Sequence, residues 1–466
     1  MKRLFLIFIV FLAAVSCGKD VIVDKDTEKK GTFEQAREFF DETKVPKLSI
    51  SITPAEWNKL LNYYDEDNAT HAYVECKEVK IEDEDRNIVC QKVGLRLRGN
   101  TSRRRPEGWN GQNHSATDPH WRRVHFGLST RIFSNSGSFE GIRRVNLKYA
   151  KEDPTYIREH YSYDLLAKYG VWTAPMTSWC RLYFNIGEDA PVYFGVYLMI
   201  ESIDKRYIKR RSEQFGGDDG WLWKCGWGAN LSNTDNWRFH QDDNSSDSYP
   251  YDLKDEDPAN FAPAKEQIKD FITRIVRLNG DDFKQWISQV MDVDLLLKMY
   301  AANIALGHWD DYWNNMNNYY LYFNSRDPYH YKVYMLPYDY DNTLGTSHNV
   351  GAQSDSGRQD PYHWGISECP LISKILEISE FRDKYTSYLS DFSSVDNPWT
   401  GQAASAYRIR GWQSMIGPYI SNDTGEDMSI SDAPASWGNH HEYRLLEDSS
   451  NNWFKVKAES IKGWIK

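Results

Sequence analysis

The stretch from Gly307 to Gly345 constrains this chain most, because it holds two acidic clusters on either side of two apolar runs. The first cluster is Asp310 and Asp311, and the second is Asp339 and Asp341. The apolar runs predict a β-hairpin, so the two clusters lie near its ends and are expected to converge. Carboxylate oxygens are ligands for a hard cation such as Mg²⁺, which leaves its other positions to water and phosphates. The stretch therefore predicts a metal–phosphate site.

Side-chain amides follow the first acidic cluster. Asn315 and Asn317 are candidate metal ligands alongside the second cluster. The hairpin itself is expected over residues 319–323 and 331–336, with Pro328 in its loop. The structural alternative for the second cluster is a capped turn after a strand.

The first half of the chain is predicted to be mainly β, with cations at the ends of strands. Strands are expected to end at Arg98, Lys148 and Lys224, and Asn100 lies in the Gly-Asn-Thr-Ser turn after Arg98. Such a cationic turn is suited to holding phosphate. A further cation, Arg123, lies in a predicted short strand. The strands expected in this half are residues 73–80, 88–98, 121–126, 141–148, 178–185, 192–201 and 220–224.

The second half is predicted to be helical. A strongly apolar helix over residues 293–304 leads the chain to Gly307. The helices expected across the whole chain are a short one within residues 32–43, one that opens at Pro54 and those over residues 155–169, 265–278, 283–291, 293–304 and 371–385. The fold class expected is therefore α+β, with a β-rich first part and a mainly helical second part.

The composition indicates a globular chain of several domains. The 466 residues are 40% hydrophobic and 15% aromatic, and the formal net charge of −11 argues against wholesale nucleic-acid binding. The expected organisation is a signal peptide at 1–17, a tether at 18–45, a β-rich N-lobe at 46–225, a polar surface insert at 226–262, a helical C-lobe with the acidic site at 263–400, and a C-terminal extension at 401–466 packed on the C-lobe.

The N-terminus resembles a bacterial lipoprotein signal. Lys2 and Arg3 precede an apolar run over residues 4–15, which is too short to span a membrane, and Cys17 follows it. The expectation is a mature chain lipidated at Cys17 and anchored to a membrane of the cell envelope. The alternative is ordinary secretion, with Cys17 in the discarded peptide.

Five cysteines remain after Cys17. Cys76 and Cys90 flank a polar stretch that predicts a hairpin loop, so they are expected to be able to pair in an oxidising compartment. No Cys/His cluster with zinc-site spacing occurs in the sequence.

Cations at strand ends, a glutamate able to pair one of them and a carboxylate–amide–carboxylate set are the parts of protein-kinase-like phosphoryl transfer. The glycine-rich loop and the other usual kinase motifs are absent from the sequence.

The sequence also resembles the spore coat protein H (CotH) kinase-like family. The match runs in order over roughly residues 46–395. The residues on which it rests are Leu97-Arg98-Gly99-Asn100-Thr101-Ser102, Val145-Asn146-Leu147-Lys148, Asp153-Pro154, Ile157-Arg158-Glu159, Ala174-Pro175, Phe194 to Glu201, Leu222-Trp223-Lys224, Asp310, Asn317 to Tyr322, Pro337 to Asp341, and Pro370-Leu371-Ile372.

The resemblance implies an atypical kinase of two lobes that binds ATP and Mg²⁺ or Mn²⁺ between them. It assigns Asp310 as the catalytic aspartate, with the neighbouring Asp311 leaving the register open, and the second acidic cluster as the metal pair. Lys148 and Glu201 look like nucleotide-lobe contacts. The chain departs from the family where Arg122-Arg123 stands in place of a frequent lysine, and arginine does not replace lysine freely at a geometric site.

Two functions from different classes remain open. The first is a kinase that transfers phosphate from ATP to a protein Ser/Thr or a glycan hydroxyl at the cell envelope. The second is a catalytically degenerate surface lipoprotein that binds a glycan or serves as an assembly scaffold. A glycoside hydrolase that uses Asp310 and Asp339 as its carboxylate pair is a weaker third, since it needs no cations at strand ends.

Overall fold

The computed structural model describes residues 31–66, 72–99, 102–134, 137–232, 239–240, 250–255, 257–346, 355–435 and 442–465. The expected signal peptide, with Cys17, and the candidate phosphate contact Asn100 lie outside these residues. Among the residues described, no helix is long and apolar enough to cross a membrane.

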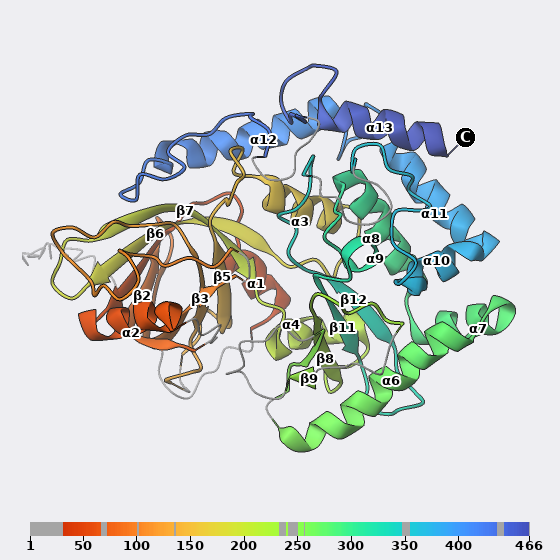
Figure 1. The fold of residues 1–466 in the computed structure, drawn as a ribbon, viewed down its shortest axis with the longest axis horizontal. Helices are drawn as coiled ribbons and strands as arrows, with labels where there is room; N and C mark the ends of the chain where they lie inside the picture. Colours follow the sequence, from red (N-terminus) through yellow and green to blue (C-terminus); the bar gives the residue numbers. More distant parts are fainter. Residues whose placement is uncertain are drawn as a thin grey trace, which may run out of the picture.

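The chain is α+β, as expected, and its β-rich first part closes into a barrel (Figure 1). The order around the barrel is β1-β2-β3-β4-β5-β7-β6, and a parallel pairing of β1 with β6 closes it. The strands are β1 (Lys47–Ile52), β2 (Val74–Glu82), β3 (Asn87–Arg98), β4 (His125–Ser129), β5 (Arg144–Lys148), β6 (Thr177–Ile186) and β7 (Val192–Glu201). Apolar side chains alternate inward along these strands and fill the barrel, so polar neighbours lie on its outer face.

A second sheet has the order β12-β11-β8-β10-β9. Its strands are β8 (Trp221–Cys225), β9 (Phe239–His240), β10 (Tyr251–Leu253), β11 (Tyr319–Phe323) and β12 (Val333–Pro337). The expected hairpin is β11–β12, with Tyr319 opposite Pro337. β8 was expected in the N-lobe but pairs with β11, and part of the expected surface insert forms β10 beside β8.

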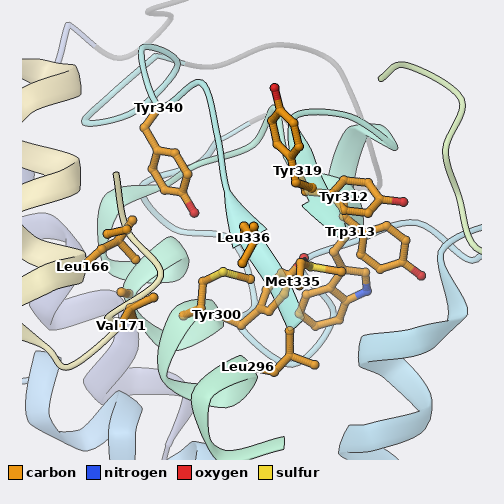
Figure 2. Close-up of a cluster of buried hydrophobic side chains, with 14 of the residues drawn as sticks. Leu166, Val171, Leu296, Tyr300, Tyr312, Trp313, Tyr319, Met335, Leu336 and Tyr340 are labelled. Atoms are coloured by element: carbon orange, nitrogen blue, oxygen red, sulfur yellow. Dashed lines mark hydrogen bonds between the residues drawn. The ribbon is translucent and has the colours of Figure 1, made fainter. Parts of the chain in front are cut away.

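Most helices lie around this second sheet and share one apolar core with it, whereas the first two helices of the chain pack into the core of the barrel (Figure 1). Tyr300 of α8 packs edge-on against Trp313 of α9 and approaches Met335 of β12 (Figure 2). The helices are α1 (Phe33–Phe39), α2 (Pro54–Asp65), α3 (Arg158–Lys168), α4 (Lys205–Arg210), α5 (Ser212–Phe215), α6 (Phe261–Arg277), α7 (Gly280–Val290), α8 (Val293–Leu306), α9 (Tyr312–Asn315), α10 (Pro370–Glu377), α11 (Ser379–Phe392), α12 (Gln402–Ile416) and α13 (Trp453–Trp464).

The C-terminal segment contacts both parts of the molecule. Trp453 at the start of α13 donates its indole N–H to the carbonyl of Ala305 in α8, at 3.2 Å. Glu426, between α12 and α13, forms an ion pair with Arg104 beside the barrel, at 2.6 Å. The segment therefore contacts the barrel as well as the helical part.

Three local expectations were wrong. The helix expected over 371–385 breaks into α10 and α11 at Ile378, which has an extended backbone. The strand expected over 121–126 begins only at His125. Cys76 and Cys90 do not pair, because they lie opposite Val93 and Val79 on the β2–β3 ladder rather than opposite each other, and all five described cysteines are free and buried.

Candidate functional site

The candidate site lies on the outer face of the barrel, where β3, β4 and β5 run side by side. Leu97 and Leu147 point into the barrel core, so Arg98 and Lys148, one residue further on, point outward. Gly127 on β4 lies between them, and a Cβ atom there would come 3.1 Å from the Arg98 Cδ. The glycine thus leaves the space through which the arginine side chain crosses β4.

Lys148 is the centre of a cluster of three carboxylates. Its ammonium Nζ lies 2.5 Å from Asp339 Oδ1, 3.0 Å from Asp341 Oδ2 and 2.8 Å from Glu159 Oε2. The two aspartates follow β12, and the glutamate lies in the first turn of α3. The structure therefore brings together the predicted cation and the predicted metal pair, and adds Glu159 to them.

The charges of this cluster shift its pKa values in opposite directions. Burial disfavours the charged lysine, but the three carboxylates outweigh burial and hold the pKa of Lys148 well above its usual value. Burial acts to raise the pKa of Asp339, yet Lys148 and Arg98 lower it to about 2. Burial raises the pKa of Glu159 and of Asp341, each against the opposing effect of Lys148. The site therefore holds more negative charge than one lysine neutralises.

The donor set fits a divalent cation. One carboxylate oxygen from each of Glu159, Asp339 and Asp341 lies within 4.8 Å of the other two. Oxygen donors of this type are those that Mg²⁺ and Mn²⁺ take in proteins. Asp339 has a left-handed backbone, with φ of 60°, and its N–H donates to the Tyr163 hydroxyl at 2.9 Å. This hydrogen bond fixes the turn that directs the carboxylate toward Lys148.

Asp310 is held by a ring of amides. Asn315 and Asn317 donate to its Oδ1 at 2.6 and 3.1 Å, while Asn318 and Asn342 donate to its Oδ2 at 2.9 and 3.1 Å. Asn342 directly follows Asp341, so this contact ties Asp310 to the segment of the carboxylate cluster. Burial raises the pKa of Asp310 to about 6, although the amide hydrogen bonds act to lower it.

Asp311 has a different environment from its neighbour. Its carboxylate caps α9 by accepting from the Asn314 N–H at 2.8 Å, and it also accepts from the Asn303 amide at 3.3 Å. Burial raises its pKa to about 8. The Asp311 side chain therefore has a structural role, as the cap of α9. This favours Asp310 over Asp311 as the reacting carboxylate. The predicted metal ligands Asn315 and Asn317 direct their N–H groups to Asp310 instead.

A second cationic group lies beside the cluster. One Arg98 nitrogen donates to Asn146 Oδ1, and the other donates to the Tyr338 hydroxyl at 2.6 Å. The Lys224 ammonium lies 5.4 Å from the centre of the Tyr338 ring. Tyr338 immediately precedes Asp339, so the predicted phosphate-binding residues Arg98 and Lys224 meet next to the acidic turn.

Two candidate residues lie in other contacts. Glu201, fully buried, pairs with Arg210 at 2.5 Å and Arg211 at 2.8 Å. Arg123, also buried, donates to the Tyr156 hydroxyl at 2.8 Å and packs against three tyrosine rings. Both side chains are therefore engaged in contacts within the fold, and the lysine at the site pairs with Glu159 rather than with Glu201.

Sequence reasoning missed two further residues of the site. Glu159 lies near the start of a predicted helix, where acidic residues are common because they stabilise the helix N-terminus. Its position in the sequence therefore did not identify it as a site residue. His125 is fully buried on β4, with its ring 4.6 Å from that of Tyr149, and burial and Lys148 lower its pKa well below the usual value. His125 lies opposite Arg98 in the strand register, which only the barrel topology reveals, and Glu159 reaches Lys148 because of where α3 packs.

Comparison with known proteins gives a consistent result. The family model described as CotH kinase protein matches residues 96–466. The chain is 25% identical to the inner spore coat protein H of Bacillus subtilis over 306 residues. This alignment covers 62% of this chain and 74% of that protein. It is 25% identical over 372 residues to invasin CotH2 of Rhizopus delemar (76% of this chain, 55% of that protein) and 27% identical over 266 residues to spore coat protein homolog 1 of the same fungus (54% and 39%).

Proposed function

The chain belongs to the CotH family, and on that premise we propose that it is a phosphotransferase that moves the terminal phosphate of ATP to a hydroxyl group of a protein Ser/Thr or a glycan. The observation that supports this most is the convergence of Lys148 with Asp339, Asp341 and Glu159, beside an acid held by four amides. Phosphoryl transfer needs positioning and charge neutralisation, and this cluster offers both.

The proposed roles follow from position. Asp310 accepts the proton of the acceptor hydroxyl. At the same time, the hydroxyl oxygen forms a bond to the terminal phosphorus of ATP, and the bond between that phosphorus and the leaving ADP oxygen breaks. Its amide partners hold the carboxylate in one orientation. Arg98, Lys148 and Lys224 neutralise phosphate charge, with Tyr338 positioning the first and last of them.

Asp339 and Asp341 would hold Mg²⁺ or Mn²⁺, because they present carboxylate oxygens at the edge of the cationic group. A bound divalent cation would neutralise phosphate oxygens and orient them for in-line transfer. The protein's own part is to keep the Asp339 carboxylate ionised, and Lys148 and Arg98 do so by lowering its pKa against the effect of burial.

The proposal extends to architecture and location. In it, the barrel is the nucleotide-binding lobe of a kinase-like pair, and the helical region with the second sheet is the other lobe. The N-terminal signal supports a further proposal, that Cys17 is lipidated and anchors the chain in the cell envelope.

The test is transfer of label from γ-labelled ATP with Mn²⁺, followed on the protein itself and on Ser/Thr-rich and glycan acceptors. Wild type should transfer label, and Lys224→Met should lower the rate at limiting ATP by about tenfold through loss of a phosphate contact. Lys332→Met, on an exposed loop, is the matched control. Label transfer by neither wild type nor control would contradict the proposal and favour a non-catalytic scaffold.

A further inference from the structure

We propose that Glu159 is a third carboxylate ligand of the metal site, and that Lys148 is a built-in cation that the metal must displace. The inference rests on the proposed function only in taking Asp339 and Asp341 as the metal pair. It goes further in naming a ligand from α3 and in making metal binding a competition with a side chain of the protein.

Glu159 has an unsatisfied oxygen at the site. The side chain is 8% exposed, and its Oε2 lies 2.8 Å from Lys148 Nζ. Its other oxygen, Oε1, is buried and has no hydrogen-bond partner among the residues that the structure describes. A buried acceptor without a partner costs free energy, and a cation in the cluster would remove that cost. The close approach of its ligand atom to those of Asp339 and Asp341 completes the donor set.

Lys148 occupies the position of a cation in this cluster. Its ammonium contacts one oxygen of each of the three carboxyl groups. A divalent ion needs the same oxygen lone pairs and cannot share them fully with the ammonium. Lysine is a point charge on a flexible four-carbon stem, so it can withdraw while its strand stays in place.

The competition has a consequence for binding order. Without a phosphate ligand, withdrawal of Lys148 removes the ammonium from its buried anionic partners, which is costly. With phosphates present beside Arg98, the ammonium gains a new anionic partner as it leaves the carboxylates. Metal and nucleotide therefore favour each other's binding, and the coupling is reciprocal.

The test is Mn²⁺ binding to the full chain without nucleotide, measured by titration calorimetry. Lys148→Met removes the competing cation and should raise the Mn²⁺ affinity by about tenfold or more. Glu159→Gln removes a ligand charge and should lower it by about tenfold.

Lys151→Met is the matched control. Lys151 contributes positive charge near Asp341 but pairs with Glu152, at 3.2 Å, rather than with the cluster. Its loss should change the Mn²⁺ affinity by less than about threefold, because a partly exposed charge that does not contact the cluster is screened by solvent and salt.

A Lys148→Met protein that binds Mn²⁺ no more tightly than wild type would overturn the inference, as would a Glu159→Gln protein with unchanged affinity. If the lysine variant unfolds without metal, its melting temperature should rise more steeply with Mn²⁺ than that of wild type, and failure to fold at saturating Mn²⁺ would also overturn the inference. Mn²⁺ affinities that change as expected in a protein that never binds ATP would contradict the kinase proposal alone. If wild type binds Mn²⁺–ATP but Lys148→Met shows no gain in Mn²⁺ affinity, the result would contradict this inference alone.

Discussion

At the scale of the residue, the site is a balance between burial and charge. Lys148 lies among three carboxylates, and their attraction outweighs the desolvation of its ammonium. Asp310 lies next to this cluster but has amides rather than cations as partners, so burial dominates and its carboxyl remains a weaker acid. Two acidic side chains in one site therefore differ in their readiness to take up a proton, as proton transfer and cation binding require.

The two neighbouring aspartates should respond differently to the same substitution. Asp310→Asn removes the proposed base and should lower the rate of phosphate transfer on the order of a hundredfold or more. Burial raises the pKa of Asp311 to about 8, so its carboxyl is mostly neutral at pH 7, and Asn caps a helix as well as Asp does. Asp311→Asn should therefore change the rate by less than roughly threefold. Steady-state rates of both variants decide the register, and equal losses would contradict it.

The pH profile should follow Asp310. A base acts when deprotonated, and burial raises the pKa of this carboxyl to about 6, so kcat/KM should increase up to about pH 6 and level off above it. Asn317→Ala removes an amide that lowers the pKa, so its profile should move to higher pH. A profile that is flat from pH 5 to 8, or that moves to lower pH in the variant, would exclude Asp310 as the base.

At the scale of the element, the periodicity of the sequence predicted where strands and helices lie better than it predicted which strands pair. The pattern of residues 88–98 predicted β3 with Arg98 at its end, and the apolar run 293–304 predicted α8. The pattern of residues 220–224 predicted a strand but not its sheet, because a strand's own side chains do not specify which edge it joins. The pairing of β1 with β6, which are far apart in sequence and close the barrel, could not be predicted for the same reason.

The junction of α8 and α13 gives a test at this scale. Gly307 ends α8 with a left-handed backbone, and a Cβ there would come 2.4 Å from the Trp453 ring of α13. Gly170 follows α3 with a left-handed backbone and open space around it. Gly170→Ala should cost about 1 kcal/mol of unfolding free energy from the backbone alone. Gly307→Ala should cost more than about 3 kcal/mol, because the clash adds to it. Urea denaturation of both variants measures the difference, and equal costs would contradict the packing of α13 on α8.

At the scale of the whole molecule, two hydrophobic cores meet at the site. One core fills the barrel, and the other joins the second sheet to the helices. Arg98 and Lys148 belong to the first part and Asp339 to the second, so the site exists only when both are folded and in contact. Sequence motifs placed most of these residues, but Glu159 entered the site because α3 packs where β5 ends, which no local pattern specifies.

The most direct test of this account is the melting temperature of the full chain with and without millimolar Mg²⁺–ATP. Wild type should gain about 2.7 kcal/mol of stability when ATP is roughly a hundredfold above its dissociation constant, and its melting temperature should rise accordingly. Asp339→Ala should lose this rise, while Asp270→Ala, which removes an exposed ion pair on α6, should keep it. No rise in wild type, or an equal rise in Asp339→Ala, would contradict the assignment of this cluster as a metal–nucleotide site.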